Sequence, residues 1–115
     1  MQFMLLIYED ESVYGPGKNG PAMEQIVAKH IAFNRDLGAV RVGGAGLKST
    51  TSATTVRTEK GKQSIHDGPF AESKEQLGGY YLIDVPDLDA AIAVAKKIPV
   101  LQDGSIEIRP VLGPG

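Results

Sequence analysis

Two stretches of the sequence are apolar at consecutive positions, and this feature limits the folds that the chain can form. Residues 2–8 form one nearly unbroken apolar run, and residues 80–85 form another. Successive side chains of a strand point to opposite faces, so a strand with one face in water alternates apolar and polar residues. These two runs do not alternate. They therefore predict central strands in a sheet whose two faces are both covered.

The helical segments show a different period. Residues 22–37 place an apolar stripe on one helical face, and Pro21 suits the first turn of that helix. A second helix is predicted from an N-cap at Asp87 to Ile98, where Pro99 ends it. The glycine- and proline-rich residues 14–20 between the first strand and helix predict a surface loop.

Shorter patterns complete the set of elements. Further strands are predicted at residues 40–42, 54–58, 63–66 and 105–111. Gly43–Gly46 is predicted to break the strand at 40–42, and residues 59–62 are predicted to form a hairpin turn. About one helical turn is predicted within residues 71–77, and a loose tail at residues 113–115. The order of elements is that of an α+β, ferredoxin-like βαββαβ fold with an inserted β-hairpin. A chain of 115 residues fits one domain, residues 1–115.

The apolar runs also bear on assembly. Two helices cover only one face of a four-stranded antiparallel sheet. Phe3, Leu5 and Ile7 are predicted to point to one face, and Met4, Leu6 and Tyr8 point to the other. A second copy related by a two-fold axis would cover that face, which predicts a homodimer. Alternatively, the inserted hairpin and the loops cover it within one chain.

Composition excludes several classes of function. The sequence has no cysteine, which removes thiolate catalysis, disulfides and cysteine-bound zinc. The net charge is −2 with scattered basic residues, so no direct contact with nucleic acid is expected. The opening apolar run is too short to span a membrane. Gly43–Gly46 leads into polar coil rather than a helix, which argues against a dinucleotide site. These features favour a cytoplasmic protein that handles small molecules or protein partners, with no cofactor and no metal.

Polar residues on the apolar helical stripe are the first candidates for a site. His30 falls within the stripe, and Asn34 lies one turn later on the same face. His30 is either a core histidine bonded to a backbone carbonyl or a general acid or base. Asp67 either stabilises its own turn or orients a nearby histidine and favours its protonated form. Tyr80 and Tyr81 can each offer a phenol to a ligand, although one of the two is expected in the core or at the dimer face. His66 is expected at the surface.

The run from Asp67 to Val85, which begins Asp-Gly-Pro-Phe and continues through Gly78-Gly79, has a specific counterpart. It resembles the signature of the YCII-related family, in the branch named for the Asp-Gly-Pro-Phe motif. Residues 4–8, 30–34, 56–57 and 105–111 fit the same family, so the resemblance spans almost the whole chain.

This resemblance implies a fold, a site and a partner. The ferredoxin-like chains of the family pair as a dimeric α/β barrel, and a helix histidine with an aspartate is proposed there as a catalytic dyad. His30 matches the histidine, and either Asp67 or Asp36 corresponds to the aspartate. Ala45 stands where many relatives have an acidic residue. The resemblance also implies an association with sigma factors of the extracytoplasmic-function class.

Two hypotheses about function follow. In the first, the protein is a cofactor-independent lyase or isomerase in which His30 moves a proton, an aspartate orients it and Asn34 holds a small organic substrate, with Phe70 and Tyr80 as further contacts. In the second, it is a non-catalytic dimer that binds a small ligand or a protein partner such as a transcription factor.

Overall fold

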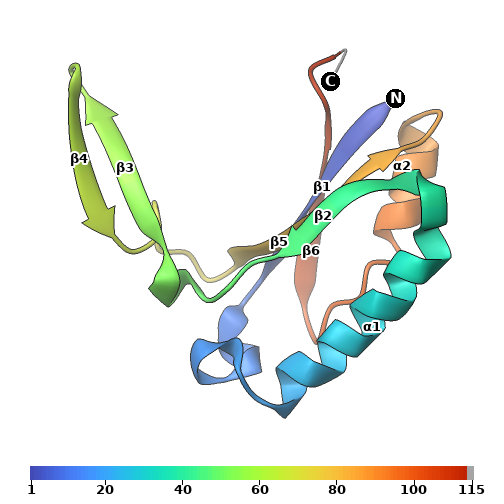
Figure 1. Cartoon of the computed structure of the whole chain (residues 1–115), viewed down its shortest axis with the longest axis horizontal. Helices are drawn as coiled ribbons and strands as arrows, with labels where there is room; N and C mark the ends of the chain where they lie inside the picture. Colours follow the sequence, from blue (N-terminus) through green and yellow to red (C-terminus); the bar gives the residue numbers. More distant parts are fainter. Residues whose placement is uncertain (114–115) are drawn as a thin grey trace.

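The two apolar runs form the central strands of an antiparallel sheet in the computed structural model, which describes residues 1–113. β1 (Gln2–Glu9) and β5 (Gln76–Asp84) are neighbours at the centre, flanked by β6 (Gly104–Pro110) and β2 (Arg41–Gly46) in the order β2-β5-β1-β6. α1 (Pro21–Leu37) and α2 (Leu88–Ala95) lie on one side of the sheet (Figure 1). This arrangement agrees with the predicted ferredoxin-like α+β fold.

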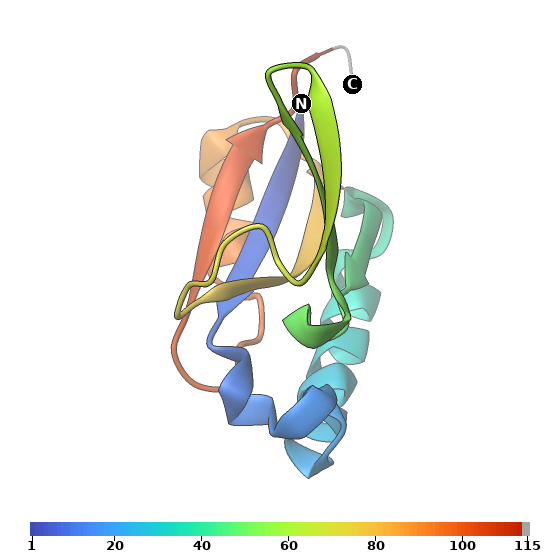
Figure 2. The ribbon, with the colours of Figure 1, turned by 90° about the vertical axis from the view of Figure 1, so that its left-hand side faces the viewer.

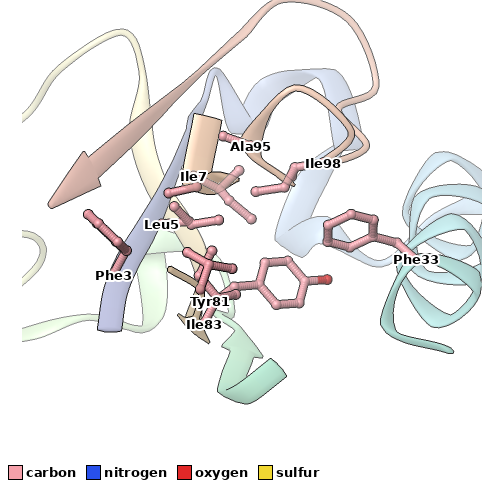
Figure 3. Packing of buried hydrophobic residues seen from close by; sticks show 10 residues of the cluster. Phe3, Leu5, Ile7, Phe33, Tyr81, Ile83, Ala95 and Ile98 are labelled. Atoms are coloured by element: carbon pink, nitrogen blue, oxygen red, sulfur yellow. The ribbon is translucent and has the colours of Figure 1, made fainter. Parts of the chain in front are cut away.

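The hydrophobic core lies between the sheet and the two helices. Alternate residues of β1 and β5 face the helices, and Phe3, Leu5 and Ile83 are almost completely buried. Phe33 of α1 reaches toward the strands, and the ring of Tyr81 points back toward α1 with its hydroxyl outermost (Figure 3). The core therefore follows the strand alternation that the sequence predicts.

The helix ends have local causes. Pro21 occupies the first turn of α1, and Gly38 ends that helix with a positive φ of 55°. The Asp87 carboxylate caps α2 by accepting a hydrogen bond of 2.9 Å from the Ala90 N–H. α2 ends at Ala95 rather than at the predicted Ile98, because residues 96–98 continue only as turns.

Three sequence predictions were wrong in detail. Gly43–Gly46 does not break the second strand but belongs to β2, because its backbone pairs with β5. Residues 71–77 form no helical turn: the Gln76 amide donates to the Ser73 carbonyl, and β5 already begins at Gln76. Glu11–Tyr14 and Pro16–Lys18 form two short 3-10 turns, and Tyr14 at the end of the first is buried rather than at the surface. The last two residues of the predicted loose tail lie outside the described residues.

The inserted hairpin projects from the side of the sheet opposite the helices (Figures 1 and 2). It consists of β3 (Thr54–Glu59) and β4 (Lys62–Asp67), joined by a tight turn in which Lys60 and Gly61 both have positive φ. The radius of gyration is 15.6 Å, against about 13 Å for a compact domain of this size. The hairpin thus extends away from the sheet.

Among residues 1–113, no helix is long and apolar enough to cross a membrane.

Candidate functional site

A cavity of about 220 Å³ lies between α1 and the β2–β5 edge of the sheet. Its lining combines apolar side chains with a small number of polar and charged ones. The polar residues of the lining are Glu9, Tyr14, Lys18, His30, Asn34, Arg41, Tyr80 and Tyr81. A concave, mostly apolar site with a few convergent polar groups is the usual form of a small-molecule pocket.

Glycine creates the space for this cavity. Gly46 of β2 pairs with Gly79 of β5, and both line the cavity, so no side chain fills the volume beneath α1 at this point. A Cβ atom on Gly79 would lie 3.0 Å from the Ala45 carbonyl oxygen, whereas a Cβ on Gly46 would meet no atom within 4 Å. Gly43–Gly46 therefore forms part of a strand that lines a pocket, and it is not a phosphate-binding loop.

His30 is held by a short polar contact at the site. Its Nδ1 lies 2.7 Å from the hydroxyl oxygen of Tyr81. The two rings are roughly parallel, with centroids 5.9 Å apart, and the Tyr81 ring packs edge-on against Phe33 at 5.2 Å. Because Tyr81 is anchored in the core, it fixes the position of a histidine that borders the cavity.

Burial sets the protonation of both partners. It lowers the pKa of His30 below its usual 6.5, against the opposing effects of the Glu9 charge and the Pro99 backbone. Burial also raises the pKa of the Tyr81 phenol, opposed by the nearby charge of Arg41. At neutral pH the imidazole is therefore uncharged and the phenol keeps its proton. The tautomer of His30 decides which of the two groups, Nδ1 or the phenol oxygen, donates the hydrogen bond between them.

A buried carboxylate lies at one end of the cavity. Glu9 accepts a hydrogen bond of 2.6 Å from the Tyr14 hydroxyl and one of 3.3 Å from the Leu101 N–H. Burial and the contact with Glu9 raise the pKa of Tyr14 above its usual range. The 3-10 turn that contains Tyr14 thus closes this end of the pocket.

The comparisons with known proteins agree with the resemblance seen in the sequence. The model of the YCII-related domain matches residues 1–113. This chain belongs to the YCII-related family. It is also similar to a protein of Rhizobium meliloti (strain 1021) named Uncharacterized protein R00369, with 38% identity over 119 aligned residues that cover 96% of this chain and 92% of the relative.

The YCII-related chain brings together only some of the predicted site residues. His30, Asn34 and Tyr80 line the cavity, as does Ala45. Asp67 is exposed at the end of β4, within the hairpin, and is not among the residues around His30. Within one chain, the side chain that contacts the His30 imidazole at hydrogen-bond distance is Tyr81.

The other predicted residues lie elsewhere. Phe70 is 75% exposed and packs against Arg57, whose guanidinium carbon is 5.4 Å from the ring centroid. It borders a separate, more open hollow at the base of the hairpin. Asp36 is exposed on α1, and His66 is exposed on β4, as predicted. Among residues 1–113, no group of three acidic or histidine side chains is placed to hold a metal ion.

Sequence reasoning did not identify the buried carboxylate of Glu9, the contact between Tyr81 and His30, or the guanidinium of Arg41 as parts of the site. Strand alternation places Glu9 on the same face as Leu5 and Ile7, and this pattern alone could have identified a buried carboxylate. The contact between Tyr81 and His30 joins positions 51 residues apart, and nothing local indicates it. Arg41 also lines the cavity; it lies within the strand predicted at residues 40–42, but sequence reasoning did not single it out as a site residue.

The substitution Glu9→Gln tests the electrostatic account of this site. The amide can still accept the Tyr14 hydrogen bond, but it removes the negative charge that favours imidazolium. We expect the pKa of His30 to fall further, measured by an NMR pH titration of the imidazole signals. Asp36→Asn removes an exposed carboxylate of α1 and should leave that pKa unchanged. An unchanged or raised His30 pKa in Glu9→Gln would contradict the account.

Proposed function

We propose that this YCII-related protein is a cofactor-independent enzyme of lyase or isomerase type, in which His30 transfers a proton on a small organic substrate. The observation that carries this proposal is the contact between His30 and Tyr81 beside the cavity. An imidazole that is uncharged at neutral pH, fixed by a 2.7 Å contact and open to a pocket has the properties of a general base. A purely structural histidine needs no adjoining cavity.

The proposed roles follow from the positions of the side chains. His30 accepts a proton from the substrate and returns it to another atom, while Tyr81 holds the imidazole through Nδ1. Tyr81 thus takes the orienting role that the family resemblance implies for an aspartate. Asn34 contacts the substrate from the cavity wall, and Tyr80 borders the cavity from β5, where its side chain alternates with that of Tyr81. Asp67 keeps the structural role of ending the hairpin, where the Gly68 N–H donates to the Ala53 carbonyl at 2.7 Å.

Hydrogen exchange at carbon tests proton transfer without knowledge of the full reaction. We expect the wild-type protein in D₂O to accelerate exchange of enolisable C–H bonds in at least one of a panel of small carbonyl compounds, followed by NMR. Removal of a general base lowers rates by about 10² to 10⁴, so His30→Gln should reduce the exchange to the buffer rate. An exposed control, His66→Gln, should retain it. Equal rates for wild type and His30→Gln across the panel would contradict a catalytic role.

We also propose that two copies pair through the sheet face opposite the helices, as a dimeric α/β barrel of the Asp-Gly-Pro-Phe branch. Met4, Leu6 and Leu82 on that face are only half-buried within one chain. Glu107 and Arg109 of β6 pair in register with Leu6 and Met4 and so face the same side. An apolar centre with a charged edge is typical of a protein interface.

The oligomeric state can be measured directly. We expect the wild-type protein to have the mass of a dimer in light scattering, and Leu82→Glu to shift it toward the monomer, because the carboxylate would be desolvated at the interface. Leu112→Glu, at a position that is 98% exposed, is the matched control and should remain dimeric. A wild-type monomer, or a Leu82→Glu protein that stays dimeric, would contradict this pairing.

A non-catalytic binding module is the second candidate. The observation that favours it is the apolar surface of the projecting hairpin, where Val56 and Ile65 are 61% and 77% exposed and Phe70 at its base is 75% exposed. Such a surface fits a protein partner, and a sigma factor is the partner that the family resemblance implies. A dimer without any His30-dependent exchange supports this second function.

A further inference from the structure

The end of the cavity opposite Glu9 contains a cation without a counter-charge. Arg41 lines the cavity, and its guanidinium carbon lies 6.0 Å from the centroid of the Tyr81 ring. Its Nη2 donates to the Gly44 carbonyl at 3.0 Å, but its Nε is buried without a hydrogen-bond partner. The salt bridges within residues 1–113 join other groups, so no acidic side chain of the described chain neutralises Arg41.

Asn34 adds a second unsatisfied polar atom to the same lining. Its Oδ1 is buried and has no donor among the described residues. Buried polar groups are almost always hydrogen-bonded, because an unpaired one costs its full desolvation energy. Two unpaired polar atoms on residues that line one cavity mark this part of the wall as a place where a ligand, with a small shift of either side chain, supplies the missing partners.

We infer that the cavity binds a small organic acid, with the carboxylate at Arg41 and an apolar body beneath α1. The inference rests on the proposed small-molecule site and adds its substrate class. The guanidinium presents planar donors that match the two oxygens of a carboxylate. Val27 and Ile31, which are 43% and 55% exposed, line the cavity and supply apolar contact.

The other charged side chains of the cavity determine the orientation of the ligand. The Glu9 carboxylate already accepts from Tyr14 and Leu101, and its charge repels an anion from that end. Lys18 donates to the Leu47 carbonyl at 3.1 Å and lies 5.9 Å from the Tyr14 ring centroid, so it is engaged at the Tyr14 end of the cavity. A carboxylate therefore binds at the Arg41 end, and the body of the acid lies alongside His30.

The size of the cavity limits the body of the acid. A dry cavity of about 150 Å³ is large enough for benzene. At about 220 Å³, this cavity admits a ring of that size with a carboxylate attached. Benzoate is therefore a suitable probe, and benzamide is its neutral match in shape.

The test compares the binding of benzoate and benzamide by calorimetry and by NMR shifts of the backbone amides. Benzoate is expected to bind the wild-type protein at least ten-fold more tightly than benzamide. Arg41→Met should remove this preference, whereas Arg35→Met, which removes an exposed cation of α1, should preserve it. Equal binding of the two probes, a preference that survives Arg41→Met, or no saturable binding of either probe at tens of millimolar overturns the inference.

A cavity-filling variant gives an independent readout that does not depend on Arg41. Gly46 has no positive φ, and a Cβ there meets no atom within 4 Å, so Gly46→Val is expected to fold. It should abolish benzoate binding by occupying the cavity, with the native fold checked by circular dichroism. Undiminished benzoate binding by folded Gly46→Val would show that the probe binds elsewhere and overturn the inference.

The outcomes separate this inference from the proposed enzyme. Arg41-dependent benzoate binding without His30-dependent hydrogen exchange supports the organic-acid site and contradicts catalysis. Exchange that is equally fast on acids and on their neutral amides, and that survives Arg41→Met, supports catalysis and contradicts the organic-acid site.

Discussion

The packing of alternate β1 and β5 side chains beneath the helices is the interaction on which the rest of this structure depends. Phe3, Leu5 and Ile83 are almost fully buried there, and each such side chain contributes about 1.5–3 kcal/mol of hydrophobic stabilisation. The same row of residues continues to Tyr81, which is 5% exposed. The core thereby carries a phenol to the border of the cavity and holds it in a fixed position.

The cavity exists because this packing stops at the glycine end of the sheet. Beyond Tyr81 the next residue of β5 on the same face is Gly79, and its partner across the ladder is Gly46. Neither residue has a side chain to fill the space under α1. The fold thus buries His30 far enough to lower its pKa, yet leaves it next to an open volume. His30 is partly buried while the volume beside it stays unfilled, and this combination distinguishes the site from the rest of the core.

Strand and helix patterns predicted most of the fold, but they predicted only part of the site. The uninterrupted apolar runs identified the two central strands, and Asp87 was correctly identified as a helix cap. The same logic identified His30 and Asn34, because helical periodicity shows which residues face inward. Local patterns can make such predictions, since each depends on residues close together in sequence.

The missed features depend on contacts between distant residues. β2 forms through glycines because its partner strand supplies the hydrogen bonds, which outweighs the low strand propensity of glycine. The partner of His30 is Tyr81 because the ladder brings β5 beneath α1. Asp67 is distant from His30 within the chain because the hairpin projects away from the helix side, a direction that no local pattern sets (Figure 1).

The most direct test of this account is the pH dependence of the unfolding free energy in wild type and His30→Gln. An unfolded histidine titrates near 6.5, whereas burial lowers the pKa of His30 in the folded protein. Below about pH 6.5 the unfolded state then binds more protons, so folding stability falls as the pH falls. The account predicts that wild type loses stability relative to His30→Gln between about pH 7 and pH 5, in denaturant titrations at one protein concentration. Parallel stability curves, or a wild type that gains relative stability in acid, would contradict a buried, uncharged His30.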